Sequence, residues 1–166
     1  GGVGGEPTAG DAGCRSELEA LIVRLGIEDR VRVLGWQEEV VAILAGGDVL
    51  VHTAPAEPFG RVLIEAMSVG VPVIAVAAGG PLEIVEPGVS GLLVGPNDVA
   101  AIASAMERLC HDKGLADRLS AGGFKRVSEE LTSRRNVRRV LEVYGEILSP
   151  KRAGGYRRSP AGVLST

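Results

Sequence analysis

The sequence predicts an α/β fold in which a parallel sheet is covered by helices on both of its faces. Short apolar runs alternate along the chain with segments whose apolar residues recur at helical spacing. These runs contain few polar residues, as expected of strands that are buried on both faces. The 166 residues are 45% hydrophobic and 23% charged, which is a globular composition with enough chain for one domain and its core.

Four strands are expected where apolar residues follow one another without a break. The third begins with Val71-Pro72, and a proline is tolerated at the start of a strand, where its missing N–H matters least. Ligands of such sheets bind at the carboxyl ends of the strands, so the loops that follow the strands are the first places to search for a site. The predicted strands cover residues 31–34, 48–52, 71–76 and 91–94.

Helices are expected between and after these strands. Residues 15–25 are apolar at positions 18, 21, 22 and 25, and Gly26 is a stop signal. Asn97 is the expected N-cap of a later helix, and Pro81 suits the first turn of a short one. The other predicted helices cover residues 38–45, 59–69, 97–111, 114–129 and 133–148.

The two ends of the chain lack this patterning. Residues 1–13 are glycine-rich and are predicted to be a loop, and residues 149–166 are predicted to be a disordered tail. The domain is therefore expected to span residues 14–148. The opening Gly-Gly-Val-Gly-Gly shows no signal peptide, and no run approaches the roughly 18 apolar residues of a membrane span.

Composition narrows the function classes. Aromatic residues make up only 3% of the chain, which argues against nucleic-acid binders that stack bases on aromatic side chains. Cys14 and Cys110 are too few and too far apart in the sequence for a disulfide framework or a zinc cluster. We therefore expect reduced thiols, a cytoplasmic protein, no metal and no nucleic-acid partner.

Charge is distributed unevenly. Residues 125–158 carry ten basic and four acidic side chains, whereas the rest of the chain carries eight basic and seventeen acidic ones. Such a basic segment either forms a solvated helix face or meets an anionic partner. The second interpretation predicts a peripheral membrane contact, centred on Arg134, Arg135, Arg138 and Arg139.

The most informative segment follows the predicted strand 48–52. Glu57 lies in the loop, and Glu65 lies eight residues later inside the next helix, across a Pro-Phe-Gly turn. Glu65 is the only acid in an apolar stretch, and a buried carboxylate without a partner is costly. Either the hydroxyls of a bound ligand or an arginine is expected to satisfy it.

The start of this helix predicts an anion site. Gly60 opens the helix, so the backbone amides of Gly60, Arg61 and Val62 are expected to be free and to point toward the strand end. Carboxylates on both sides of a phosphate cradle suit a nucleotide diphosphate sugar. The alternative is an ordinary junction between a loop and a helix.

Two further segments follow predicted strands. Gly79-Gly80, after strand 71–76, permits close approach of a ligand to the backbone, although ordinary turns use the same residues. Trp36, the only tryptophan, follows strand 31–34. Its ring either stacks on a base or packs the loop onto the sheet.

Taken in order, these segments resemble the C-terminal domain of the family 4 glycosyltransferases, which are retaining enzymes of the GT-B fold (glycosyl transferases group 1). The resemblance covers about residues 14–148 and implies a Rossmann-like sheet that forms the C-terminal half of that fold. The matching segments are Arg30 to Trp36, Asp48 to His52, Glu57-Pro58-Phe59-Gly60, Glu65-Ala66-Met67, Gly70 to Ala75, Gly79-Gly80, Glu83-Ile84-Val85, Gly88 and Gly91 to Val94.

The resemblance implies a role for each matching residue. Glu57 would be the catalytic-site carboxylate that faces the hydroxyls of the donor sugar, with the amides of Phe59 and Gly60 nearby. Glu65 would accept the ribose hydroxyls. The amides of Arg61 and Val62 would hold the diphosphate.

It also implies how the base is held. Trp36 would stack on the base, and the backbone near Val33 would read the edge of the base. Gly79 and Gly80 would line the donor pocket. No metal or cofactor is implied, and a hexose would be transferred with retention of configuration.

The sequence departs from the family in what precedes these segments. The N-terminal acceptor-binding domain and the first two strands of the C-terminal domain are missing, as is the basic pair that the family places against the diphosphate. We therefore interpret the chain as a fragment that is inactive by itself, and we expect strand 31–34 to lack a neighbour. A sugar-nucleotide epimerase or phosphorylase on the same fold, or a non-catalytic nucleotide-sugar-binding module, are the alternatives.

Overall fold

The computed structural model describes residues 9–148, with side chains from residue 13 onward. It divides into two units, residues 1–40 and residues 41–166, and each is described by itself. The disordered tail predicted for residues 149–166 and the loop predicted for residues 1–8 lie outside the described residues.

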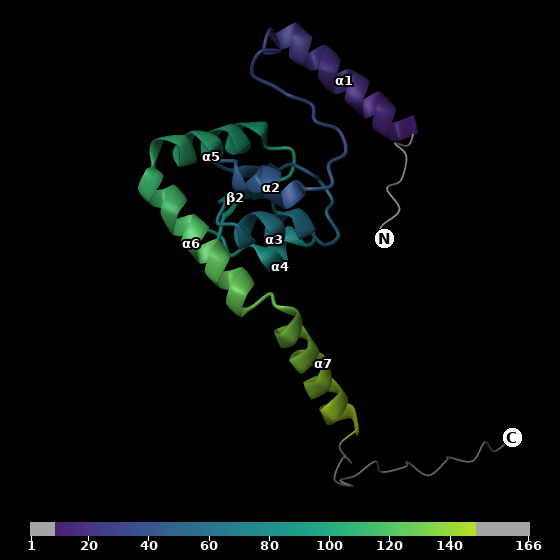
Figure 1. The fold of residues 1–166 in the computed structure, drawn as a ribbon, viewed down its shortest axis with the longest axis vertical. Coiled ribbons are helices and arrows are strands. Elements are labelled where there is room, and N and C mark those ends of the chain that lie inside the picture. The colour runs from purple at the N-terminus through teal and green to yellow at the C-terminus, as the bar shows by residue number, and fades with distance from the viewer. Residues whose placement is uncertain (1–8, 149–166) are drawn as a thin grey trace, which may run out of the picture. The chain divides into compact units, whose positions relative to one another are not determined.

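The first unit contains one long helix, α1 (Ala9–Leu25) (Figure 1). The helix ends as predicted at Gly26, which has a φ of 64°, and the Ile27 amide closes the turn onto the Ile22 carbonyl at 3.3 Å. The prediction of a loop as far as residue 13 is wrong, because the helix already begins at Ala9. Extending an existing helix adds one hydrogen bond per residue, which outweighs the propensity cost of Gly10 and Gly13.

The strand predicted for residues 31–34 is absent. This segment has no strand assignment, and the sheet in the described part of the chain contains only three later strands. Leu34 is 48% exposed, and the Val31 amide bonds to the Ile27 carbonyl in a local turn. A strand requires a neighbour for its N–H and C=O groups, so this result agrees with the expectation that the run would lack one.

The second unit is built on a parallel sheet of three strands in sequence order. They are β1 (Leu50–His52), β2 (Val73–Val76) and β3 (Leu92–Val94). Val51 is opposite Ile74, and Ala75 is opposite Leu93. All four residues of the central strand β2 are buried. Three of the four predicted strands are confirmed, each one or more residues shorter than predicted.

Six helices accompany this sheet, close to where the apolar spacing predicted them (Figure 1). The short helix expected at Pro81 is present, with the proline in its first turn. None of the helices in the described part of the chain is long and apolar enough to span a membrane. The helices are α2 (Val40–Ala45), α3 (Arg61–Ser68), α4 (Pro81–Ile84), α5 (Val99–His111), α6 (Lys113–Glu129) and α7 (Ser133–Leu148).

Helices cover both faces of the sheet, as predicted. Side chains alternate along β2, so Val73 and Ala75 point to one face and Ile74 points to the other. Val73 and Ala75 pack with buried residues of α3 and α4, whereas Ile74 packs with Leu109 of α5 and Leu119 of α6. The carboxyl ends of β1 and β2 are thereby held at one edge of a two-sided core.

The cap of α5 differs from the prediction. Asp98 is the N-cap, because its Oδ1 accepts a hydrogen bond from the Ala101 amide at 2.8 Å. Asn97 instead has a φ of 60°, a left-handed turn conformation that asparagine tolerates better than most residues. Either side chain can cap a helix, so this backbone turn decides between them.

Candidate functional site

Two loops meet where β1 and β2 end. Glu57, in the loop after β1, forms a parallel bridge with Gly79, in the loop after β2. The Gly80 amide donates to the Glu57 carbonyl at 2.8 Å. The pairing of the two strands therefore continues into the segments that carry the predicted site residues.

Gly79 and Gly80 are required for this contact between the loops. A Cβ at Gly79 would lie 2.3 Å from the Glu57 carbonyl oxygen, and one at Gly80 would lie 2.0 Å from the Phe59 carbonyl oxygen. Gly79 also has a φ of 64°, which favours glycine. The two glycines thus permit close contact with the loop that carries Glu57, and the close approach of a ligand to them stays a prediction.

The Glu57 carboxylate holds the turn before α3. Its Oε1 accepts hydrogen bonds from the amides of Phe59 at 3.0 Å and Gly60 at 2.7 Å. These two bonds, together with the nearby His52, lower the pKa of Glu57 below its ordinary value, and they outweigh the opposing effect of desolvation. Glu57 is therefore an ionised acceptor at neutral pH.

The prediction of three free amides is partly wrong. The Gly60 amide is taken by Glu57, because Gly60, with a φ of 88°, turns the backbone toward that carboxylate. The amides of Arg61 and Val62 have no acceptor among the residues that the structure describes. These two donors lie at the positive end of the α3 dipole, which is an environment that favours an anion.

Glu65 is neither deeply buried nor unpaired, contrary to the first interpretation of its apolar surroundings. Its side chain is 26% exposed, and its Oε1 is 3.2 Å from Nη2 of Arg61, one helical turn earlier. The alternative of an arginine partner is thus confirmed. Arg61 is 81% exposed, so this exposed pair leaves Glu65 accessible to other hydrogen-bond donors.

His52 is the site residue that sequence reasoning missed. It is the last residue of β1, and its Nε2 is 3.4 Å from Oε2 of Glu57. Its side chain is 11% exposed, less than half the exposed fraction of Glu57. The sequence signal that could have identified it is a histidine at the end of an apolar strand, five residues before Glu57.

The structure thus joins six predicted site residues on one segment: Glu57, Phe59, Gly60, Arg61, Val62 and Glu65. Gly79 and Gly80 contact that segment through the loop bridge. Val33 and Trp36 belong to the unit of residues 1–40 and are described separately. Trp36 is 77% exposed, and both interpretations of its ring stay predictions.

Arg126 of α6 supports α4 and its C-terminal end. Its Nε donates to the Ile84 carbonyl at 2.7 Å, and its Nη2 donates to the Glu83 carbonyl at 2.9 Å. Its Nη1 pairs with Glu130 at 3.0 Å. The guanidinium satisfies carbonyls at the end of a four-residue helix, where orphan acceptors otherwise remain.

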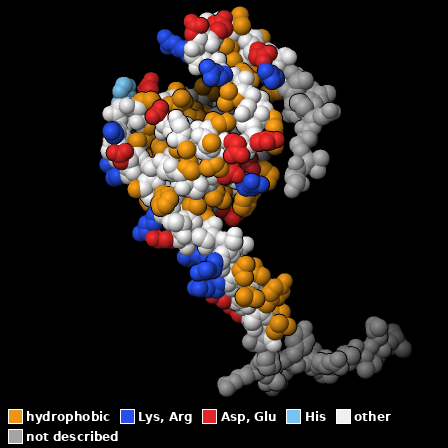
Figure 2. Space-filling model, in the orientation of Figure 1, with side chains coloured by type: hydrophobic (Ala, Val, Ile, Leu, Met, Phe, Trp, Pro, Cys, Tyr) orange, Lys and Arg blue, Asp and Glu red, His pale blue; other side chains and the backbone are white. Residues whose placement is uncertain are grey.

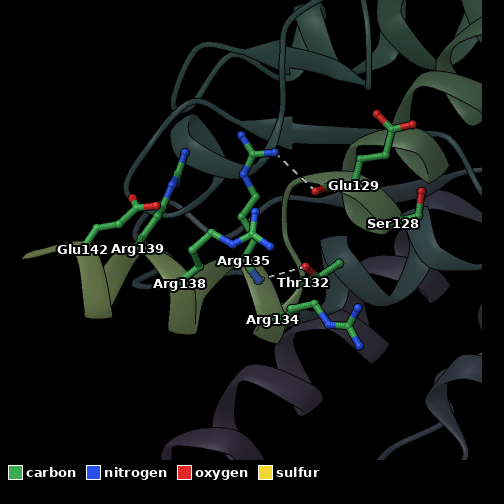
Figure 3. A pocket seen from close by; sticks show the side chains of 8 residues that line it. All are labelled: Ser128, Glu129, Thr132, Arg134, Arg135, Arg138, Arg139 and Glu142. Carbon is green, nitrogen blue, oxygen red and sulfur yellow. Dashed lines mark hydrogen bonds between the residues drawn. The ribbon is translucent and has the colours of Figure 1, made fainter.

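A pocket of about 680 Å³ lies between the end of α6 and α7. The arginines singled out in the sequence line it (Figure 3). Arg135 reaches back to the Glu129 carbonyl at 3.4 Å, and its amide donates to Oγ1 of Thr132. The lining residues are Ser128, Glu129, Thr132, Arg134, Arg135, Arg138, Arg139 and Glu142.

Helix α7 also exposes many apolar side chains. Figure 2 shows its hydrophobic side chains gathered on one side of the helix and its basic side chains on the other. No apolar side chain of α7 is buried in the structure. The exposed apolar residues are Val137, Val140, Leu141, Val143, Tyr144, Ile147 and Leu148.

No group of three or more His, Cys, Asp or Glu side chains among residues 13–148 is arranged to hold a metal ion. The exposed thiols of Cys14 and Cys110 are free.

Comparisons with known proteins give the family. The family model described as "Glycosyl transferases group 1" matches residues 8–126. A lipopolysaccharide core biosynthesis glycosyltransferase, LpsD of Rhizobium meliloti, is 38% identical over 135 residues, which are 81% of this chain and 38% of LpsD. A D-inositol 3-phosphate glycosyltransferase of Salinispora tropica is 37% identical over 82% of this chain and 29% of its own length. The chain thus spans about a third of these relatives.

Solved structures agree in fold. HepE of Anabaena in complex with UDP-glucose superposes with a TM-score of 0.76 at 32% identity, covering 83% of this chain and 38% of HepE. The C-terminal domain of a group 1 glycosyl transferase from Francisella tularensis superposes with a TM-score of 0.68 at 26% identity, covering 76% of this chain and 66% of that one. The architecture is that of the C-terminal half of the GT-B fold, and the chain belongs to the glycosyl transferases group 1 family.

Proposed function

We propose that this chain is the donor-binding domain of a retaining glycosyltransferase, which transfers a hexose from a nucleotide diphosphate sugar to an acceptor bound by a separate N-terminal domain. The observation that carries the proposal is the start of α3. Two unbonded amides, of Arg61 and Val62, lie there between two partly exposed carboxylates, of Glu57 and Glu65. Donors for a diphosphate thus adjoin acceptors for sugar hydroxyls.

The family resemblance implies the role of each residue, and this order of donors and acceptors fits those roles. The Arg61 and Val62 amides bind the diphosphate, and the exposed Arg61 guanidinium adds positive charge beside it. Glu65, one turn further along α3, accepts the ribose hydroxyls. Glu57 accepts a hydroxyl of the transferred sugar. The Anabaena HepE structures contain UDP and UDP-glucose, which supports a nucleotide sugar as the ligand of this fold.

The proposal also assigns the residues that contact the nucleotide base and the residues that line the donor pocket. Trp36 stacks on the base, and the backbone at Val33 reads the edge of the base. Gly79 and Gly80 form the side of the pocket next to the sugar. Because these roles rest on the family resemblance, substitution of Trp36 with measurement of nucleotide affinity is their direct test.

The chemistry required of the chain is electrostatic. As the bond from the anomeric carbon to the diphosphate breaks, its electron pair moves to the leaving phosphate oxygen, and the α3 amides stabilise the developing charge. The low pKa of Glu57 keeps it ionised, so it serves as a hydrogen-bond acceptor and not as a proton donor. No metal is required in this scheme, and the configuration at the anomeric carbon is retained.

Binding to the 166-residue chain tests the donor site. Amide NMR spectra are recorded with UDP-, ADP- and GDP-glucose in turn. We expect one nucleotide series to shift the amides of Arg61 and Val62, and Glu65→Gln to weaken that binding about tenfold, as expected for losing a hydrogen bond to a charged group. Glu107→Gln, at an exposed position of α5, is the matched control. Absence of binding by all three nucleotides would overturn the proposal.

An assay of sugar transfer to an acceptor tests the rest of the proposed function. We expect no turnover from this chain alone, because the proposed acceptor site lies on another domain. Robust sugar transfer by the 166 residues would contradict the placement of the donor and acceptor sites on separate domains. Release of an epimerised sugar would favour the epimerase alternative.

The proposal includes a peripheral contact between α7 and an anionic membrane from the cytoplasmic side. Four arginines line the pocket beside α7, and the opposite side of the helix exposes seven apolar side chains. A helix with basic and apolar sides suits the plane of a lipid interface.

A further inference from the structure

His52 has an unusual position at the end of β1. Its ring is largely buried, with a side-chain exposure of 11%, and its Nε2 is 3.4 Å from Oε2 of Glu57. Its Nδ1 is fully buried and has no hydrogen-bond partner among the residues that the structure describes. One ring nitrogen therefore lies beside a carboxylate, and the other has no hydrogen-bond partner among the described residues.

This asymmetry selects one tautomer of the neutral ring. A neutral imidazole carries a single N–H, and the other nitrogen is an acceptor. A proton on Nδ1 would be a buried donor without an acceptor, which is costly, and it would place the Nε2 lone pair against a negative oxygen. A proton on Nε2 instead points to Oε2 of Glu57. The geometry assigns the N–H of His52 to Nε2.

The same contacts account for the acceptor capacity of Glu57. An ionised carboxylate has about four lone-pair directions, two on each oxygen. Both directions of Oε1 are occupied by the amides of Phe59 and Gly60. The His52 N–H takes one direction of Oε2, so a single acceptor direction remains. Rotation of the carboxylate would break the two amide bonds and the 3.4 Å contact with His52 together.

We propose that His52 is a positioning residue for the donor sugar: its Nε2–H fixes Oε2 of Glu57 so that one lone pair is left for one hydroxyl of that sugar. This rests on the proposed function, because it takes the ligand of Glu57 to be the sugar of a nucleotide diphosphate sugar. The consequence is selectivity, since a fixed oxygen with one vacant lone pair accepts a hydroxyl from one direction only.

The tautomer is tested first, without a ligand. The chain contains only two histidines, His52 and His111, so nitrogen NMR of the histidine-labelled chain yields two ring systems. We expect His52 to show the pure Nε2–H pattern at pH values where its ring is neutral. His111, which is exposed at the end of α5, serves as the tautomer-averaged reference. An averaged His52 ring, or one protonated at Nδ1 alone, would overturn the proposal.

The effect on the ligand is tested by affinity. UDP and UDP-glucose are titrated into the chain, with the ADP and GDP pairs run in parallel, and the ratio of the two affinities is the readout. We expect His52→Leu, which keeps the buried apolar volume and removes the donor, to lower UDP-glucose affinity about tenfold and UDP affinity far less. His52→Gln, which retains an N–H donor, should recover part of the loss.

The possible failures differ in kind. If the parent chain binds the nucleotide diphosphate but the ratio is unchanged in His52→Leu, the positioning role is wrong and the proposed function stands. If the parent chain binds none of the nucleotide diphosphates and none of their glucose conjugates, the proposed function is wrong. The role of His52 in positioning the sugar is then wrong as well. An equal loss for both ligands, with a lowered melting temperature, assigns His52 a structural role only and overturns the proposal.

Discussion

The backbone amide of Gly60 donates a hydrogen bond to the side chain of Glu57 at 2.7 Å, so the residue before α3 is tied to a carboxylate three positions earlier. Only the next two amides, of Arg61 and Val62, remain for a ligand. The carboxylate thus determines which amides at the start of α3 stay unbonded.

Acid should destabilise the protein through Glu57. Because its folded-state pKa is below the ordinary value of 4.5, its contribution to the free energy of unfolding is present above that value and is lost as the pH falls through the folded pKa. Urea unfolding between pH 7 and pH 3 should therefore be less pH-dependent in Glu57→Gln than in the parent chain. Equal slopes for the two chains, with Glu107→Gln as the control, would show that the amide bonds do not act on this carboxylate.

Gly80→Ala should destabilise the contact between the two loops. The backbone of Gly80 is helical, with φ −52° and ψ −40°, so alanine strains no dihedral angle. Its Cβ would nevertheless lie 2.0 Å from the Phe59 carbonyl oxygen, and overpacking of this kind costs about 1–3 kcal/mol. Denaturant unfolding measures the loss. Gly46→Ala, whose Cβ would be 3.6 Å from the nearest atom, should be nearly neutral.

Removal of Arg61 should separate stability from binding. Arg61 is 81% exposed, and exposed pairs one helical turn apart contribute only about 0.3–0.5 kcal/mol. We expect Arg61→Met to leave the melting temperature almost unchanged but to weaken nucleotide diphosphate binding severalfold. An unaltered dissociation constant would mean that the guanidinium lies away from the diphosphate.

Arg126→Met should weaken the support of α4. It deprives the Ile84 and Glu83 carbonyls of their charged donor, and leaving such acceptors unsatisfied costs about 1–3 kcal/mol. Lys125→Met, at the exposed neighbouring position on α6, is the matched control. Equal unfolding free energies for the two variants would indicate that water replaces the guanidinium without loss.

The membrane contact predicts salt-dependent flotation. The chain should float with vesicles that contain anionic phospholipid at low salt and dissociate at high salt, because screening weakens contacts between exposed charges. Substitution of Arg134, Arg138 and Arg139 by glutamine should abolish flotation. Failure to float at low salt would leave the apolar side of α7 to a protein partner.

Local sequence signals predicted the elements but not their pairing. Continuous apolar runs identified β1, β2 and β3, and helical spacing identified α3, α5, α6 and α7. Residues 31–34 carry the same signal as these strands, yet they form none, because a ladder depends on a neighbour that no local pattern reveals. The elements that the sequence predicted correctly are those whose formation depends on burial of their own apolar residues.

The sequence predicted which segment carries the candidate site but not the contacts of its side chains. The spacing of Glu57 and Glu65 around Gly60 identified the correct segment, because a turn and a helix start are local features. The rotamer that directs Glu57 to its own loop, and the pairing that brings His52 beside it, depend on tertiary structure. The contact of Gly79 and Gly80 with the Glu57 loop, likewise, is visible only in the tertiary structure.

The bridge between Glu57 and Gly79 also affects the order of folding. It continues the β1–β2 ladder beyond His52, so the turn before α3 is complete only after two segments some twenty residues apart in sequence have met. The Gly80 amide donates a hydrogen bond across this junction. Its protection from hydrogen exchange therefore reports when the two segments have paired. A ligand that binds the α3 amides in the folded chain alone would, at a hundred times its dissociation constant, add about 2.7 kcal/mol to the free energy of unfolding.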